Sequence, residues 1–156
     1  MSTFTLHTVN PDAVEIARRT GRDVNDNTVV SSYAAGGEPL RCCLRDAAPG
    51  ERIILFGYRP TLPASPYVET GAVFAHADPC AGPWSTTVYP ADWIGRPQVL
   101  RAYDARGWIH PASTTHDGAD PEAVLAEVLA RPGVVEAHSR NISYGCFMFS
   151  ATRVSR

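Results

Sequence analysis

The sequence predicts an α+β fold: a single domain spanning residues 1–156, with a mainly antiparallel sheet and two helices packed on one face. Three observations predict it. Two segments carry capped helix patterns, several short apolar segments lie between them, and the short connections favour antiparallel neighbours. A length of 156 residues is close to the common size of one domain.

Two segments carry helix signals at both ends. Residues 10–12 (Asn-Pro-Asp) supply a cap, a proline at the first helical position and an acid in the first turn, and Gly21 would end this helix. The second helix begins at residues 120–122 (Asp-Pro-Glu) and stops near residues 131–133 (Arg-Pro-Gly). Its apolar face is formed by Val124, Leu125, Val128 and Leu129. Such a face predicts packing on a sheet.

Short apolar segments bounded by Pro, Gly, Asp or Ser predict the strands. Between the helices they cover residues 40–44, 52–58, 72–77 and 98–103. Residues 52–58 are apolar on both faces, as expected of a central strand.

Two further turns predict hairpins. Residues 104–107 (Asp-Ala-Arg-Gly) predict a loop whose return strand is residues 108–110. After the second helix, residues 134–141 and 145–154 predict a strand pair around residues 142–144.

The composition excludes several function classes. It is 44% hydrophobic and 19% charged with a formal net charge of −2, so we expect no nucleic-acid partner. All 14 basic residues are Arg. A chain without Lys has neither a lysine Schiff base nor the lysine of a P-loop.

The first residues and the cysteines predict a cytoplasmic protein. The start lacks the basic and apolar regions of a secretion signal, and no segment approaches the roughly 18 apolar residues of a membrane span. We therefore expect no membrane partner. The four cysteines, Cys42, Cys43, Cys80 and Cys146, would then be reduced thiols.

Four blocks of the chain carry a family resemblance. They are residues 56–60 (FGYRP), 66–80 (PYVETGAVFAHADPC), 100–104 (LRAYD) and 140–147 (RNISYGCF). With these blocks the chain resembles a bacterial family designated domain of unknown function 1203 (DUF1203), over nearly its whole length. The resemblance implies no assigned activity, so candidate chemistry has to be inferred from the residues.

Glu136, His138 and Arg140 alternate along the predicted strand 134–141 and therefore point to one side. If that side is open to water, they form a solvated face. If it lines a cleft, Arg140 can bind a carboxylate or phosphate, while the acid and the imidazole orient or move a proton.

A second group lies around the turn into strand 72–77. Glu69 and His76 predict a base and its orienting carboxylate, with Tyr67 before them and Cys80 after them. The alternative is a structural histidine in an otherwise apolar strand.

His76 and Cys80 also have a His-x-x-x-Cys spacing, and Cys42, Cys43 or Cys146 would complete a zinc ligand set. On a continuous strand, positions 76 and 80 are about 13 Å apart, so both reach one metal only if residues 77–79 turn. No CxxC pair is present. We therefore predict no bound metal or cofactor and keep a zinc-binding domain as the third hypothesis.

Cys146 is the preferred candidate for a cysteine nucleophile, ahead of Cys43 and Cys80. A nucleophilic thiol needs a neighbouring cation or imidazole that lowers its pKa, and Arg140 or His138 would supply one across the strand pair. The alternative is a buried structural cysteine.

The main hypothesis is a small bacterial enzyme or binding protein for a polar, anionic small-molecule ligand. Its predicted catalytic residues are Glu69, His76, His138 and Cys146, and its predicted ligand-binding residues are Tyr58, Arg59, Tyr67, Arg101, Tyr103, Arg140 and Asn141. The rival hypothesis is a non-catalytic protein-interaction module, such as a homo-oligomer. A closed pocket with His76 and Arg140 would favour the first, and an exposed sheet edge without a cleft the second.

Overall fold

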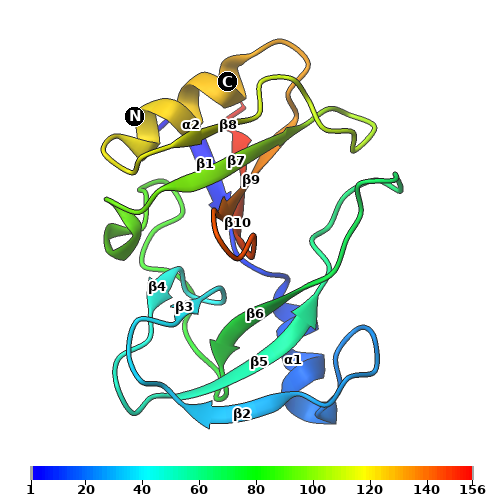
Figure 1. Ribbon diagram of the computed structural model, residues 1–156, viewed down its shortest axis with the longest axis vertical. Coiled ribbons are helices and arrows are strands. Elements are labelled where there is room, and N and C mark those ends of the chain that lie inside the picture. Colours follow the sequence, from blue (N-terminus) through cyan, green and yellow to red (C-terminus); the bar gives the residue numbers. More distant parts are fainter. Residues whose placement is uncertain (1, 156) are drawn as a thin grey trace. The chain divides into compact units, whose positions relative to one another are not determined.

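The computed structural model describes residues 2–155, which form a strand-rich α+β structure with two α-helices and two five-stranded sheets (Figure 1). These residues divide into two compact units. The first holds the residues up to His7, Thr61–Val68 and those from Ser85 onwards, and the second holds Thr8–Pro60 and Glu69–Trp84. The predicted single domain stays a prediction, because only an unfolding experiment establishes whether the two units unfold together.

The first unit is built on an antiparallel sheet with the strand order β1-β10-β9-β7-β8. Its strands are β1 (Phe4–His7), β7 (Gln98–Tyr103), β8 (Thr114–His116), β9 (Glu136–Asn141) and β10 (Phe147–Arg153). The helix α2 (Pro121–Ala130) packs against this sheet, and the 3-10 helix η1 (Ala91–Trp93) belongs to the same unit. Its core is aromatic: Trp93 stacks on Phe149 at 6.2 Å between ring centroids, and Tyr89 meets Phe149 edge-on at 5.6 Å.

The second unit is built on a sheet with the strand order β2-β5-β6-β3-β4. Its strands are β2 (Val30–Tyr33), β3 (Pro39–Leu40), β4 (Arg45–Asp46), β5 (Arg52–Tyr58) and β6 (Gly71–His76). All pairs are antiparallel except β3 with β6, which are parallel with Leu40 opposite Phe74. The helix α1 (Pro11–Thr20) packs against β5. Leu40, Cys43 and Ile53 are among the buried residues of this unit's core.

Both predicted helices are confirmed, with their caps. The Asn10 side chain accepts a hydrogen bond from the backbone N–H of Asp12 at 2.9 Å, and α1 ends at Gly21, whose φ is +68°. The Asp120 side chain accepts from the backbone N–H of Ala123 at 3.3 Å at the start of α2. The helices contact different sheets, so the expected packing of both on one face is not confirmed.

Most of the predicted strands are confirmed. Residues 52–58 and 98–103 form β5 and β7 with the predicted bounds, residues 72–77 correspond to β6, and the late strand pair corresponds to β9 and β10. Within the described residues, neither α-helix is long and apolar enough to cross a membrane. The cytoplasmic location stays a prediction.

Two strand predictions are wrong, and four strands were not predicted. Of residues 40–44 only Leu40 lies in a strand; residues 41–44 form a turn in which the N–H of Leu44 donates to the carbonyl of Leu40 at 2.9 Å. Residues 108–110 contribute one isolated bridge, Ile109 with Tyr103, because β7 pairs instead with β8 and β9. The strands absent from the prediction are β1, β2, β4 and β8.

Candidate metal centre

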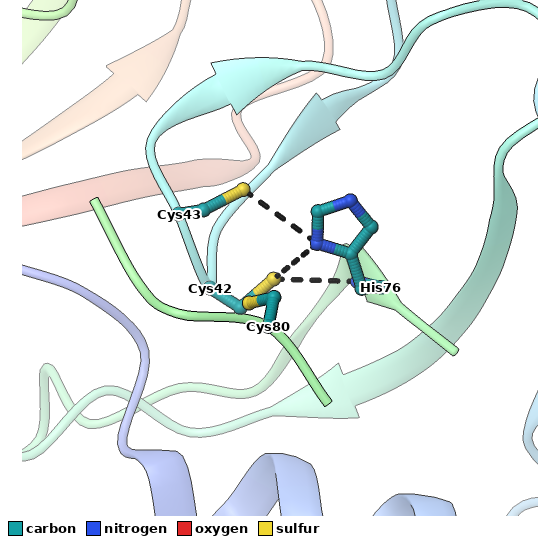
Figure 2. Close-up of side chains that lie close together, drawn as sticks. All are labelled: Cys42, Cys43, His76 and Cys80. Atoms are coloured by element: carbon teal, nitrogen blue, oxygen red, sulfur yellow. Dashed lines mark hydrogen bonds between the residues drawn. The ribbon is translucent and has the colours of Figure 1, made fainter. Parts of the chain in front are cut away.

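Cys42, Cys43, His76 and Cys80 converge within the second unit (Figure 2). One ligand atom of each, three Sγ atoms and one imidazole nitrogen, all lie within 4.8 Å of one another. The cysteine pair and the His76 to Cys80 segment are separated by more than thirty residues of chain. Tertiary pairing therefore creates this group, which we call the thiol–imidazole cluster.

The parallel pairing of β3 with β6 places the two segments side by side. The N–H of Arg41 donates to the carbonyl of Phe74 at 2.9 Å, and further along the N–H of His76 donates to Sγ of Cys42 at 3.3 Å. The turn at residues 41–44 then brings the side chains of consecutive residues, Cys42 and Cys43, to the same imidazole (Figure 2). A continuous strand would have pointed them to opposite faces.

Cys80 reaches the cluster because the chain bends directly after β6, at residues 77 and 78. The N–H of Ala77 donates to the carbonyl of Arg52 at 3.0 Å, and the Arg52 guanidinium pairs with Asp78 at 3.0 Å. This bend is the turn that the spacing of His76 and Cys80 requires if both are to bind one metal ion.

The distances in the cluster suit tetrahedral zinc. Sγ of Cys42 lies 3.5 Å, and Sγ of Cys43 3.7 Å, from Nδ1 of His76. With Zn–S of about 2.3 Å and Zn–N of about 2.0–2.1 Å, tetrahedral sulfur and nitrogen ligands lie about 3.6 Å apart and two sulfurs about 3.8 Å apart. The ligand atoms of the cluster are at most 4.8 Å apart. Pairs of sulfur atoms would therefore have to approach each other by at most about 1 Å to bind a zinc ion.

Glu51 and Arg45 contact the other nitrogen of the imidazole. Nε2 of His76 lies 3.4 Å from Oε1 of Glu51 and 3.1 Å from Nη2 of Arg45, while Arg45 pairs with Glu51 through two contacts of 2.6 and 3.0 Å. The hydrogen bond from Arg45 lowers the pKa of Glu51 to about 2. If Nδ1 binds a metal, Nε2 carries a proton and donates a hydrogen bond to Glu51, in the way that carboxylates orient metal-bound histidines, and Arg45, which only donates, then bonds to Glu51 alone.

The predicted pairing of His76 with Glu69 is not formed. Glu69 precedes β6 and His76 ends it, so the strand alone separates them by about 17 Å. Sequence reasoning missed Glu51 and Arg45 because neither has a motif spacing to His76. Only the pairing of β5 with β6 and of β4 with β3 brings them close.

The pKa values of the three cluster thiols are shifted in different directions. A hydrogen bond from the Cys43 thiol, aided by the backbone N–H of His76, holds the pKa of Cys42 well below its ordinary value despite burial. The same hydrogen bond, together with burial, raises the pKa of Cys43, and burial raises the pKa of Cys80. A bound cation would displace the protons of these two thiols, as metal ions do with thiol ligands.

Comparison with known proteins assigns the family. A family model described as "Protein of unknown function (DUF1203)" matches residues 37–153. The chain belongs to the DUF1203 family. The resemblance found in the four sequence blocks is thus confirmed, and the matched segment contains the whole thiol–imidazole cluster with Glu51 and Arg45. No curated protein and no solved structure matches the chain.

The predicted polar face of β9 is largely buried in this DUF1203 protein. His138 is only 1% exposed, its Nε2 lies 3.1 Å from Oε2 of Glu136, and its ring packs against Tyr103 at 4.7 Å and Phe147 at 5.3 Å. Nδ1 of His138 is buried without a hydrogen-bond partner. A solvated face is therefore the wrong interpretation, although a role in proton transfer stays a prediction.

Cys146 lies between β9 and β10, in the first unit, and is not part of the thiol–imidazole cluster. Its Sγ is 3.9 Å from the carbonyl oxygen of Tyr144, and Nη1 of Arg140 donates to the carbonyl of Gly145 at 3.0 Å. Its role as a nucleophile stays a prediction.

The predicted ligand-binding residues of the DUF1203 chain are divided between the two units. In the second unit, the Tyr58 hydroxyl accepts from the N–H of Asn10 at 3.0 Å, and Nε of Arg59 donates to the Thr70 hydroxyl at 3.4 Å. A role of either side chain in ligand binding stays a prediction.

In the first unit, Tyr67 packs edge-on against Trp108 at 5.6 Å, and Arg101 lies opposite His138 in the register of β7 and β9. Asn141 accepts from Nε2 of Gln98 at 3.2 Å and borders a cavity of about 630 Å³. The other residues that line this cavity are Arg96, Pro97, Gln98, Ile142, Ser143 and Tyr144.

Proposed function

We propose that this DUF1203 protein binds zinc through Cys42, Cys43, His76 and Cys80. One observation carries the proposal: three sulfurs and one imidazole nitrogen from separate segments lie within 4.8 Å of one another. Thiolate and imidazole are the donors that zinc prefers, and three cysteines with one histidine are a known structural ligand set.

The ligand number supports a structural role. Four protein ligands complete a tetrahedron and leave no position for a substrate. The ion would join the turn after β3, the end of β6 and the bend that follows it. Leu44, beside the two cysteines, has a φ of +56°, which is uncommon for a residue with a side chain and persists only where surrounding contacts hold it. Metal ligation by Cys42 and Cys43 would supply such a constraint.

The measurement that tests the proposal is a titration of metal-free, reduced protein with Zn²⁺ against a chromogenic chelator, with Co²⁺ absorption as a second readout. We expect one ion per chain and sulfur-to-cobalt charge-transfer bands. Cys43→Ser and His76→Ala should each weaken zinc binding by more than about 100-fold, because each removes a ligand.

Cys146→Ser is the matched control, since it removes one of the four cysteines without removing a cluster ligand. It should bind zinc like the unmodified chain. Absence of stoichiometric binding, or an equal loss in Cys146→Ser and Cys43→Ser, would contradict the proposal.

A second candidate function, binding of a polar small molecule, is supported by the cavity beside Asn141. Its volume of about 630 Å³ is within the range of ligand pockets. Its lining residues combine the polar Arg96, Gln98 and Asn141 with Ile142 and Tyr144. Saturable NMR shifts at these residues on adding phosphate or a dicarboxylate would support this function, and shifts elsewhere or none would oppose it.

A further inference from the structure

We infer that Cys42 and Cys80 form a dithiol that a hydroperoxide oxidises to a disulfide, and that this oxidation releases the metal ion. The release of metal rests on the proposed zinc function. The oxidation of the two thiols does not, because it depends only on the contacts of the sulfur atoms.

Cys42 has the environment of the attacking sulfur. Its Sγ accepts a hydrogen bond from the backbone N–H of His76 at 3.3 Å and lies 3.5 Å from Nδ1 of the same residue. A cysteine sulfur held by a backbone hydrogen bond beside an imidazole is placed to attack a peroxide oxygen. Cys42 is half-buried, in contrast to the buried Cys43.

Cys80 has the position of the resolving thiol. It is the exposed cysteine of the cluster, it follows the bend after β6 outside any strand, and its Sγ lies within 4.8 Å of that of Cys42. Forming a disulfide of roughly 2.05 Å requires the two sulfurs to approach by at most about 2.7 Å.

Cys43 is a poorer partner although it is adjacent. It is 7% exposed and belongs to the buried core of the second unit. A disulfide between consecutive residues also closes a small ring across a planar trans peptide, which strains that peptide. Cys146 is not a member of the cluster.

The two steps balance. The Cys42 thiolate attacks one peroxide oxygen; an S–O bond forms and the O–O bond breaks. The departing group, an alkoxide or, from hydrogen peroxide, hydroxide, takes a proton from the solvent and leaves as an alcohol or as water. The sulfur is oxidised by two electrons and the peroxide is reduced. The Cys80 sulfur then attacks the sulfenic acid; an S–S bond forms, the S–O bond breaks, and hydroxide leaves with the Cys80 proton as water. Zinc itself changes no oxidation state.

The test treats metal-free protein with one equivalent of hydrogen peroxide and follows intact mass, dimedone labelling and peptide mapping. We expect a mass loss of about 2 Da and a Cys42–Cys80 disulfide. In Cys80→Ser the reaction should stop at a Cys42 sulfenic acid that dimedone traps. Cys146→Ser should behave like the unmodified chain, and Cys42 should react at least about tenfold faster than Cys146.

A disulfide of Cys42 with Cys43, or oxidation of Cys146 before Cys42, would overturn the inference. An unchanged mass of the unmodified chain after peroxide treatment would also overturn it, and so would a rate of peroxide oxidation in Cys42→Ser equal to that of the unmodified chain. The same treatment of zinc-loaded protein, with chelator absorbance as the readout, should release one equivalent of metal as the disulfide forms.

The two proposals fail separately. If the metal-free chain forms the disulfide but binds no zinc, the proposed function is wrong and the dithiol stands. If zinc binds with the expected stoichiometry but peroxide produces no Cys42–Cys80 disulfide, the dithiol is wrong and the zinc site stands.

Discussion

Replacement of Glu51 by Gln tests the ion pair that positions the His76 ring. The pKa of Glu51 falls from an ordinary value of 4.5 to about 2, chiefly through Arg45. That difference corresponds to at most about 3.4 kcal/mol of folding free energy. The side chains of Arg45 and Glu51 are 42% and 29% exposed, so solvent screening reduces the expected contribution to about 1–2 kcal/mol at pH 7.

The pH dependence follows from the direction of the shift. A carboxylate whose pKa is depressed by folding stabilises the protein fully above the unfolded pKa, and this stabilisation disappears as the pH falls from about 4.5 through about 2. The stability difference between the unmodified chain and Glu51→Gln should therefore fall to under about half its pH 7 value at pH 3.

Urea denaturation at pH 7 and pH 3, with chelator and reductant present, measures this difference. Glu15→Gln is the control, because Glu15 pairs with Arg18 at 3.9 Å and its side chain is 60% exposed, so it should cost less than about 0.5 kcal/mol. An equal cost of Glu51→Gln at both pH values would refute the electrostatic argument and indicate that packing or the hydrogen bond to the N–H of Ala48 is responsible.

Three other perturbations have defined outcomes. Gly118→Ala should destabilise the chain by more than about 2 kcal/mol in thermal denaturation, since the new Cβ would lie 2.5 Å from the backbone nitrogen of Arg96 at a φ of +87°; a smaller loss would show that the loop relaxes. Asp23→Ala should cost about 2–3 kcal/mol and speed hydrogen exchange at Gly57, whose N–H donates to the Asp23 carboxylate at 2.8 Å. Burial raises the pKa of Tyr89 to about 12, above its ordinary value of 10. The free energy of unfolding should therefore fall between pH 10 and about 12 as the Tyr89 hydroxyl ionises in the unfolded chain, and an alkaline titration of Tyr89→Phe should lack this part of the fall.

Helix caps and apolar runs in the sequence predicted those helices and strands that depend mainly on neighbouring residues. The caps of α1 and α2 and the apolar runs of β5 and β7 depend on neighbouring residues, so their bounds could be read from the sequence. β2 is exposed along its whole length and has no apolar alternation to detect. β1 has only four residues, and its partner β10 lies at the other end of the chain.

The candidate site was predictable in part for the same reason. The spacing of His76 and Cys80 is local, and it identified the need for a bend between them. Which cysteines complete the cluster depends on the parallel pairing of β3 with β6, which no local pattern encodes. The sequence at residues 40–44 was interpreted as a strand. In the structure residues 41–44 form a turn, and this turn brings Cys42 and Cys43 to the same imidazole.

The order in which the chain is synthesised gives the two units different folding histories. Every residue of the second unit, including all four cluster ligands, has been made once Trp84 is added, before β7, β8, β9 and β10. β1 must wait for its partner β10 (Phe147–Arg153), which is made after the whole second unit. Until then the apolar side chains of Phe4 and Leu6 lack their partner strand, and this long-range pairing is expected to be a slow step of folding. A nascent chain stalled before β10 would thus hold all residues of the thiol–imidazole cluster together with an unpaired first strand, which is prone to aggregation.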